Sequence, residues 1–389
     1  MEYWVWLQSC IGYGTGKIKY ILEKYGSAEA CYKVSTEELR QSGVFTDKEI
    51  SNFSNRSLEN ARKIIDYCAK TDIRIITISD DEYPDLLKQI NSPPTLLYAR
   101  GDVSLLKAIP LICIVGPREV STYGQRAAFS LAARLASGGF GIVSGGAVGT
   151  DTAVHKGAMA VQGKTICVLG SGIDANYLMR NEELRREVSK AGLLISEYQP
   201  KLPATKYSFP IRNRIMSALA LGTVVIEAGE KSGALITANH AAEQGRDVFV
   251  IPGSPSAPQY KGSNRLIRDG AKPLLEASDI FEEYIFEYGD KLDIERAFSQ
   301  KITLQKESDT DQVGKIIEKL KKDEKKKKNL QDNLSKNAKI VYNCLDKEIF
   351  LLDDINAEGI TGSELLAAIT ELEIFGYIEA LPGGRYSLK

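Results

Sequence analysis

The chain has 389 residues, of which 43% are hydrophobic and 26% charged, and its net charge is −1. The composition is ordinary for a globular protein, and the length exceeds what one hydrophobic core usually organises, so we expect two or three domains. The near-neutral charge argues against a surface coated in basic residues but allows a local basic cleft, because a ligand responds to the field where it binds.

The same sequence argues against a membrane, metal or disulfide protein. It has no run of about 18 apolar residues, and its start, MEYWVWLQSC, lacks the basic region of a signal peptide, so we expect a cytoplasmic protein. The six cysteines show no C-x-x-C spacing, and two histidines are too few for a His-based metal site. We therefore expect neither a metal nor a disulfide framework.

Residues 1–70 are predicted to form short helices. In IGYGTGKIKYILEKYGS, a glycine-rich turn precedes an amphipathic helix with Ile18 and Ile21 on one side and Gly26 at its end. A Gly-x-Gly-x-x-Lys turn between helices is typical of a helix-hairpin-helix or SAM-like domain, whose backbone amides can hold a DNA phosphate. An ordinary glycine turn in a small helical domain explains the stretch equally well.

Residues 71–108 hold two strand-like runs and are expected to pack on the domain that follows. Residues 109–285 alternate between apolar strands and helices, which predicts an extended Rossmann-like α/β core with a doubly wound parallel sheet. Ligands of such sheets bind at the carboxyl ends of the strands. The strands are expected at 111–115, 141–143, 165–169, 193–195, 223–226 and 248–251, and the helices at 124–137, 151–162, 180–190 and 234–244.

The last hundred residues predict a linker and a small domain. Residues 286–335 are highly charged and are expected to be solvated. Residues 336–389 predict a helix, a second short helix, the stretch TGSELLAAITELEIFG and a hairpin turning at 382–384, which together indicate a winged helix. The would-be recognition helix has three glutamates and no Lys or Arg, so we expect it to contact protein rather than a phosphate backbone.

One motif resembles a cofactor site and is set aside. TICVLGSGIDA, residues 165–175, has the spacing of a dinucleotide fingerprint, and Glu197 follows the next strand. However, Asp174 would put negative charge where a pyrophosphate lies, and the next helix begins too late. We expect no NAD and no other cofactor. His155 and His240 lie in helical patterns and are expected to be structural.

The strongest ligand signal is IVSGGAVGTD, residues 142–151. Its glycines let a ligand approach the backbone closely, and the helix that follows offers unpaired amides to a phosphate. Thr150 adds a hydroxyl, and Asp151 is expected to cap the helix. There is no Gly-Lys-Ser/Thr, which argues against a Walker-type hydrolase. A turn needed only for tight strand–helix packing is the alternative.

Two further loops are expected at the same sheet edge. Arg118 follows the first core strand and is expected to point into the crevice. In VVIEAGEKSGALITANH, Lys231 and Ser232 open a helix that carries Thr237, a second anion-friendly helix start. Glu227 could be a catalytic acid or could cap a neighbouring turn, and the lack of a partner base favours the cap.

The stretch KYSFPIRNRIMSALA interleaves cations with an aromatic residue. Lys206, Arg212 and Arg214 surround Phe209, ahead of a helix expected to begin near Asn213. Cations follow phosphates while a ring stacks on a base, so the pattern suits a single-stranded nucleic acid. Alternatively, Phe209 is buried and one arginine alone is a ligand.

Together these stretches resemble the DprA/Smf family, the DNA-processing proteins of bacterial transformation. The matching blocks are VGPREVSTYG, IVSGGAVGTDTAVHKGA, VLGSGID…N, LISEY, FPIRNRI, SGALITANHAAEQGRDVFVIPG and GSNRLIRDGA, in family order. The resemblance implies a homodimer that binds single-stranded DNA without turnover and delivers it to the RecA recombinase past single-strand-binding protein. The chain departs from the family at Val148, where a basic residue is usual, and at Leu178 and Gln199.

We therefore predict a non-enzymatic single-stranded DNA binder. The predicted DNA-binding residues are Arg118, Ser144, Gly145, Gly146, Gly149, Thr150, Asp151, Lys206, Phe209, Arg212, Asn213, Arg214, Lys231, Ser232 and Thr237. The alternative is a nucleotide-processing enzyme of related fold, of the phosphoribohydrolase type. Those enzymes carry Pro-Gly-Gly-x-Gly-Thr-x-x-Glu, whereas here Ser144 replaces the proline and Val154 or His155 stands near the glutamate. A third possibility is an adaptor that acts through residues 336–389 alone.

Overall fold

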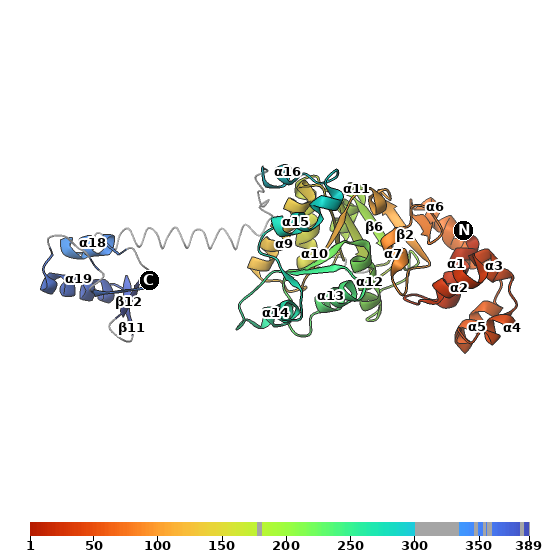
Figure 1. Cartoon of the computed structure of the whole chain (residues 1–389), viewed down its shortest axis with the longest axis horizontal. Coiled ribbons are helices and arrows are strands. Elements are labelled where there is room, and N and C mark those ends of the chain that lie inside the picture. Colours follow the sequence, from red (N-terminus) through yellow and green to blue (C-terminus); the bar gives the residue numbers. More distant parts are fainter. Residues whose placement is uncertain are drawn as a thin grey trace. The chain divides into compact units, whose positions relative to one another are not determined.

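The computed structural model describes residues 1–176, 181–299, 334–345, 349–352, 355, 360–381 and 385–388. It contains two compact units, Met1–Leu304 and Gln305–Lys389 (Figure 1). None of the described helices is both long and apolar enough to cross a membrane.

The first unit begins with six helices. Their bounds are α1 Glu2–Ile11, α2 Lys17–Tyr25, α3 Ala28–Lys33, α4 Thr36–Gln41, α5 Asp47–Ser54 and α6 Glu59–Lys70. The helix predicted after the glycine-rich turn is confirmed as α2: Ile18 and Ile21 are fully buried, and Gly26 ends it with a φ of 79°. Thr46 and Glu49 form a capping box at the start of α5.

Nine strands form one sheet in the order β1-β2-β6-β5-β4-β3-β7-β8-β9. From β6 to β9 all neighbours are parallel, whereas β1, β2 and β6 pair antiparallel. The strands are β1 Arg74–Thr77, β2 Leu96–Gly101, β3 Leu111–Val115, β4 Gly141–Ser144, β5 Thr165–Leu169, β6 Leu193–Ser196, β7 Gly222–Val225, β8 Asp247–Val250 and β9 Lys272–Pro273. The predicted parallel α/β core is thus confirmed, and its six predicted strands agree within one residue.

Helices cover both faces of the sheet (Figure 1). Side chains of β3 alternate between two cores: Ile112 and Ile114 pack with α9, α10 and α15, whereas Cys113 and Val115 pack with α12 and α13. The helices of this part are α7 Asp85–Gln89, α8 Leu105–Ala108, α9 Thr122–Ser137, α10 Thr150–Ala160, α11 Glu182–Ala191, α12 Ser208–Leu219, α13 Gly233–Glu243, the 3₁₀ turn η2 Pro258–Tyr260, α14 Lys261–Arg268, α15 Ser278–Tyr288 and α16 Ile294–Ser299.

Two features differ from the sequence prediction. Residues 71–108 do more than pack on the core, because β2 joins its sheet by pairing with β6, and β1 pairs with β2. Helix α12 begins at Ser208, five residues before the predicted start. Pro210 lies in its first turn, where a missing N–H costs nothing, so the proline does not delay the helix.

The second unit has a three-stranded antiparallel sheet in the order β10-β12-β11. Its elements are α18 Lys336–Asn343, β10 Ile349–Leu351, α19 Gly362–Ile374, β11 Ile378–Leu381 and β12 Arg385–Leu388. The predicted hairpin pairing is confirmed by β11 and β12. Its turn at 382–384, and residues 300–333 of the predicted linker, lie outside the described residues.

Candidate nucleic-acid interface

The predicted ligand loops meet at the carboxyl edge of the sheet. The glycine-rich loop follows β4, the Arg118 loop follows the adjacent β3, and the loop leading to α13 follows β7, the next strand in order. Helix α12 packs against β3, β4 and β5. The parallel order therefore brings together four segments that are far apart in the sequence.

The glycine-rich loop is locked to its neighbour by backbone contacts. Gly149 has a φ of 84°, and a Cβ atom there would overlap the carbonyl oxygen of Arg118. The backbone N–H of Thr150 donates to the carbonyl of Pro117 at 3.2 Å, and its hydroxyl donates to the same oxygen at 3.1 Å. Ser144 likewise donates to the carbonyl of Ile114 at 2.8 Å. These two hydroxyls, which we expected to face DNA, are fully buried and hold the loop.

Asp151 does not cap α10, contrary to the sequence prediction. Gly149 occupies the cap position, and the Asp151 carboxylate turns back to accept the N–H of Ala147 at 3.1 Å. Burial raises the pKa of Asp151, while Arg212 and the loop N–H groups oppose the rise. Within the described residues, the N–H groups of Val148 and Gly149 have no acceptor. The loop thus presents two backbone donors beside a helix start, where an anion is favoured.

Arg212 lies beneath this loop instead of on its surface. Its side chain is 6% exposed, and its guanidinium occupies the space where a Cβ atom of Gly145 would lie. It donates to the carbonyl of Val168, and its Nε has no partner among the described residues. Burial lowers the pKa of Arg212, and the charge of Asp151 opposes that change. The prediction that Arg212 binds a phosphate directly is therefore corrected. Because α12 begins at Ser208, its register places the Arg212 side chain on the buried side of the helix.

The next two predicted residues are also enclosed. Arg214 forms a buried ion pair with Glu197, and the two side chains are 6% and 3% exposed. Asn213 is buried and donates to the carbonyl of Gly233 at 3.4 Å, at the start of α13. We expected both in the DNA groove. Each has a structural partner instead, because α12 is enclosed on all sides beyond its first turn.

Exposed cations and aromatic rings lie at the same edge of the sheet. The Arg118 guanidinium carbon lies 5.4 Å from the centroid of the Phe209 ring, and that ring packs on Gly170. Lys206 is exposed, with its Nζ 5.0 Å from the ring centroid of Tyr207, which is 66% exposed. Tyr207 is absent from the predicted set, although the adjacent cation could have indicated it.

The loop after β7 combines one exposed cation with structural partners. Lys231 is exposed, while Ser232 caps α13 by accepting the N–H of Ala234 at 3.3 Å. Thr237 is 1% exposed, so the prediction that Thr237 contacts DNA is corrected. The interpretation of Glu227 as a cap is confirmed: it accepts the N–H of Ser121 at 3.1 Å at the start of α9 and the Tyr260 hydroxyl at 2.8 Å.

A second residue missed by the sequence prediction supports the glycine loop from α11. Asn181 is buried and donates to the carbonyl of Gly146 at 3.1 Å and to the Thr152 hydroxyl at 3.0 Å. The sequence could have indicated this residue, because Asn181 is the asparagine that ends the block VLGSGID…N. His155, as expected, is structural: its Nδ1 lies 2.7 Å from the Thr165 hydroxyl, and burial lowers its pKa to about 3.

The rejected dinucleotide motif is filled by protein. A Cβ atom at Gly172 would overlap the carbonyl oxygens of Gln199 and Pro200. Asp174 forms a two-pronged ion pair with Arg100, at 2.7 and 2.9 Å, and accepts the Tyr67 hydroxyl at 3.0 Å. This carboxylate therefore joins the helical region to the core.

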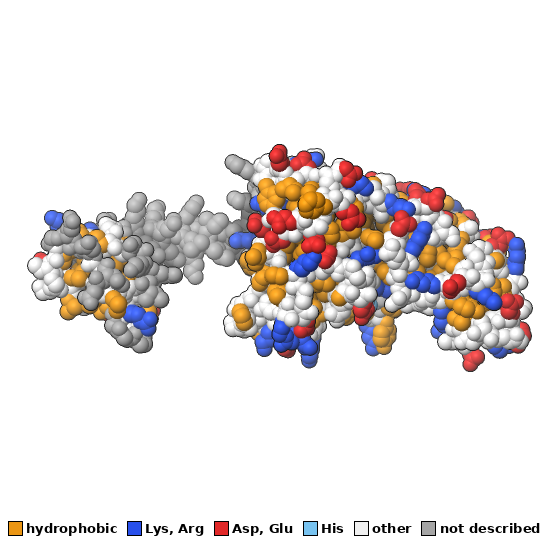
Figure 2. Space-filling model, in the orientation of Figure 1, with side chains coloured by type: hydrophobic (Ala, Val, Ile, Leu, Met, Phe, Trp, Pro, Cys, Tyr) orange, Lys and Arg blue, Asp and Glu red, His pale blue; other side chains and the backbone are white. Residues whose placement is uncertain are grey.

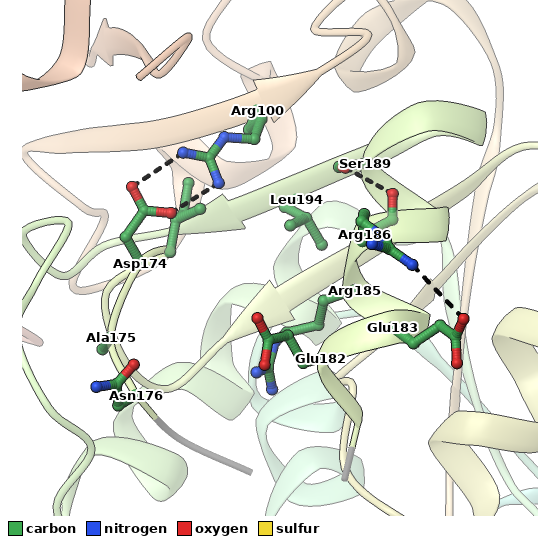
Figure 3. A pocket seen from close by; sticks show the side chains of 11 residues that line it. Arg100, Asp174, Ala175, Asn176, Glu182, Glu183, Arg185, Arg186, Ser189 and Leu194 are labelled. Carbon is green, nitrogen blue, oxygen red and sulfur yellow. Dashed lines mark hydrogen bonds and ion pairs between the residues drawn. The ribbon is translucent and has the colours of Figure 1, made fainter. Parts of the chain in front are cut away.

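A cavity of about 670 Å³ opens beside the Arg100–Asp174 pair (Figure 3). None of the predicted site residues lines it. Among the described residues its charged lining is balanced, with Arg100, Arg185 and Arg186 against Asp174, Glu182 and Glu183. The cavity therefore does not favour a polyanion.

The glycine-rich turn of the helical region is not an open phosphate site. Gly14 donates its N–H to Glu197 at 3.2 Å, and a Cβ atom there would lie 2.7 Å from Ile211. Tyr13 packs on Tyr198, with ring centroids 4.6 Å apart. Lys17 forms an ion pair with Glu49. Of the two interpretations of this turn, the geometry favours a structural one, in which it attaches the helices to the core.

These features define a Rossmann-like α/β protein whose carboxyl-edge loops present a glycine-rich turn and exposed cations, an arrangement suited to phosphorylated ligands. Residues 74–285 match the family described as DNA recombination-mediator protein A. The chain belongs to this DprA/Smf family.

Relatives and solved structures agree with the assignment. The DNA processing protein DprA of Bacillus subtilis is 42% identical over 211 residues, which are 54% of this chain and 71% of that protein. Protein Smf of Synechocystis is 30% identical over 396 residues, which are 99% of this chain and 98% of that protein. The X-ray structure of DprA from Streptococcus pneumoniae superposes with a TM-score of 0.63 at 32% identity, covering 73% of this chain and 98% of that one. A structure of Helicobacter pylori DprA, which is reported for its single-stranded DNA binding mode, superposes with a TM-score of 0.50 at 29% identity. The match covers 55% of this chain and 97% of that one.

Proposed function

We propose that this chain is a non-enzymatic, cytoplasmic mediator that binds single-stranded DNA along the carboxyl edge of its sheet. Family membership and the single-stranded DNA binding described for the Helicobacter relative support the ligand. Loading of RecA onto the bound strand, homodimer formation and a role in natural transformation are further parts of the proposal, and they rest on the family resemblance.

The observation that carries the proposal is the position of Arg118. Its guanidinium lies at the Phe209 ring, and its backbone abuts Gly149. One exposed cation is thus held beside both an aromatic ring and the two unpaired loop donors. A phosphate on the N–H groups of Val148 and Gly149 would lie next to Arg118, while a base could stack on the guanidinium plane or on the ring.

The predicted residues then divide into two roles. The contact residues in this proposal are Arg118, Val148, Gly149, Lys206, Tyr207, Phe209 and Lys231. The supporting residues, which hold these groups in place, are Ser144, Gly145, Gly146, Thr150, Asp151, Arg212, Asn213, Arg214, Ser232 and Thr237. A family-typical cation is missing at Val148, so the loop would hold phosphate by backbone donors and by Arg118.

Two carboxylates at this edge of the sheet, Glu227 and Asp151, are too engaged by the protein to serve the nucleotide-processing alternative. Glu227 is fully buried and accepts hydrogen bonds from Ser121 and Tyr260. Asp151 is engaged by the loop N–H of Ala147 and lies near Arg212. A general acid or base must reach the reacting atom, and neither group is placed to do so. Hydrolysis of nucleoside monophosphates by the intact protein would contradict this part of the proposal.

The test compares strands and one matched pair of variants. The intact protein is titrated with labelled single-stranded DNA and with the same sequence as a duplex, over a range of salt concentrations. Arg118→Ala is expected to weaken single-strand binding about tenfold, or about 1.4 kcal/mol, and to lower the logarithmic salt slope by about 0.7. Lys164→Ala, an exposed cation at the opposite sheet edge, should change neither. Equal affinities for wild type and Arg118→Ala would overturn the cleft assignment.

A further inference from the structure

Helix α14 stands beside the proposed cleft and is fixed there firmly. The N–H of Ser263 donates to the carbonyl of Ala228 at 2.9 Å, and a Cβ atom at Gly262 would lie 2.6 Å from the carbonyl oxygen of Gly229. Asn264 holds the preceding loop by donating to the carbonyl of Gly253 at 2.9 Å and accepting its N–H at 3.2 Å. The helix is therefore a rigid neighbour of the loop between β7 and α13.

The outer face of α14 is basic. Lys261, Arg265 and Arg268 are exposed and are spaced four and three residues apart, which places them along one side of the helix. Figure 2 shows Lys and Arg side chains gathered over this helix. The side chains of Arg265 and Arg268 are 71% and 74% exposed.

These cations have little structural use. Arg265 and Arg268 both approach Asp269, each at 3.5 Å, and exposed ion pairs of this kind contribute on the order of 0–1 kcal/mol. One carboxylate cannot neutralise two guanidinium groups, so the face keeps a positive charge. Such a face next to a nucleic-acid cleft attracts phosphates.

We propose that α14 is a second phosphate-binding surface, which continues the path of a single strand beyond the cleft. The inference rests on the proposed function. The loops from β6 to β8 span five strand spacings, about 24 Å, or about seven nucleotides at the spacing of a stacked strand. A strand that enters at Lys206 and crosses the glycine-rich loop reaches the start of α13 and then the basic face of α14. A short oligonucleotide fills the cleft alone, whereas a longer one engages both surfaces.

The test uses the full chain, a double variant and two oligonucleotide lengths. Arg265→Gln with Arg268→Gln is titrated with single strands of about 4 and about 16 nucleotides, over a range of salt concentrations. On the long strand the variant is expected to bind at least about fivefold more weakly, with a salt slope lower by about 1.4. On the short strand its affinity should equal that of wild type. The matched control, Lys164→Gln with Lys190→Gln, removes two exposed cations at the amino edge and should change neither strand.

Three outcomes would overturn the inference. Unchanged binding of the long strand would show that α14 does not touch DNA. An equal loss on both lengths would show that the pair acts on the cleft itself or on the overall charge. Unchanged DNA binding together with lost binding of an acidic partner protein would assign the face to that partner. If the wild-type protein binds neither strand, the proposed function fails first, and this inference falls with it.

Discussion

Two glycine-rich turns in this chain resemble each other in sequence and differ in what their backbone N–H groups do. In the helical region, the turn at residues 12–16 donates the Gly14 N–H to Glu197 and packs against α12. At the sheet edge, the turn at 145–149 keeps the N–H groups of Val148 and Gly149 without acceptors in the described residues and stands beside the exposed Arg118. Glycine density shows that something approaches the backbone closely. Whether that is a ligand or another part of the protein depends on contacts distant in sequence.

The largest expected effect tests the packing of the open turn. Gly149→Ala adds a Cβ atom that overlaps the Arg118 carbonyl oxygen, so the two loops must separate. We expect single-strand affinity to fall at least about 30-fold, or about 2 kcal/mol, in a binding titration. Gly245→Ala is the matched control, because Gly245 also has a positive φ, 69°, but nothing within 4 Å of its added Cβ. A similar loss in both variants would mean that backbone strain, and not the loop contact, explains the effect.

The next prediction concerns the helix that follows the open turn, α10, and the pH dependence of its stability. The folded protein keeps His155 neutral, with a pKa lowered by burial to about 3, whereas the unfolded chain takes up a proton near pH 6.5. Acidification below about pH 6.5 therefore favours unfolding. Between pH 7 and pH 5 the cost attributable to His155 is about 2 kcal/mol. Denaturant unfolding of wild type and His155→Gln at both pH values should show the smaller loss in the variant, and equal losses would exclude His155 as the cause.

A smaller effect is expected from the cation beneath the open turn. Removing one of two buried opposite charges is costly, so Arg212→Met is combined with Asp151→Asn and the double variant is compared with wild type. The double variant should bind single strands about fivefold more weakly, or about 1 kcal/mol, because Gly145 loses the side chain that supports it. The salt slope should stay the same, since Arg212 is buried and makes no phosphate contact. A slope lower by about 0.7 would instead place Arg212 on the DNA.

The smallest effect is expected at the closed turn. Lys17 pairs with Glu49 and stands beside N–H groups that the protein itself uses. Lys17→Ala should change single-strand affinity less than about twofold, or about 0.4 kcal/mol. A tenfold loss in the same titration would reopen the helix-hairpin-helix interpretation and remove the contrast between the two turns.

The sequence predicted most of the core and only part of the site. Strands such as β3 and β5 are continuous apolar runs, so their bounds could be read directly. The start of α12 could not, because Pro210 is equally compatible with a first helical turn and with a break. That start sets the helical register in which Arg212 and Arg214 point to the interior.

Long-range partners explain the rest of the difference. Arg214 is buried because Glu197, which follows β6, supplies its counter-charge. Local spacing carries no information about such a partner. Residues such as Arg118 and Lys206, which lie in loops at the sheet edge, were placed correctly because the parallel topology alone fixes where those loops gather.

Hydrogen exchange of the two turns tests the central claim most directly. Exchange is followed by mass spectrometry on peptides that cover residues 145–152 and 12–18, with and without saturating single-stranded DNA. We predict that DNA slows exchange in the first peptide, because phosphate accepts the N–H groups of Val148 and Gly149, and leaves the second unchanged. DNA that binds with full affinity yet slows only residues 12–18, or neither peptide, would contradict the account.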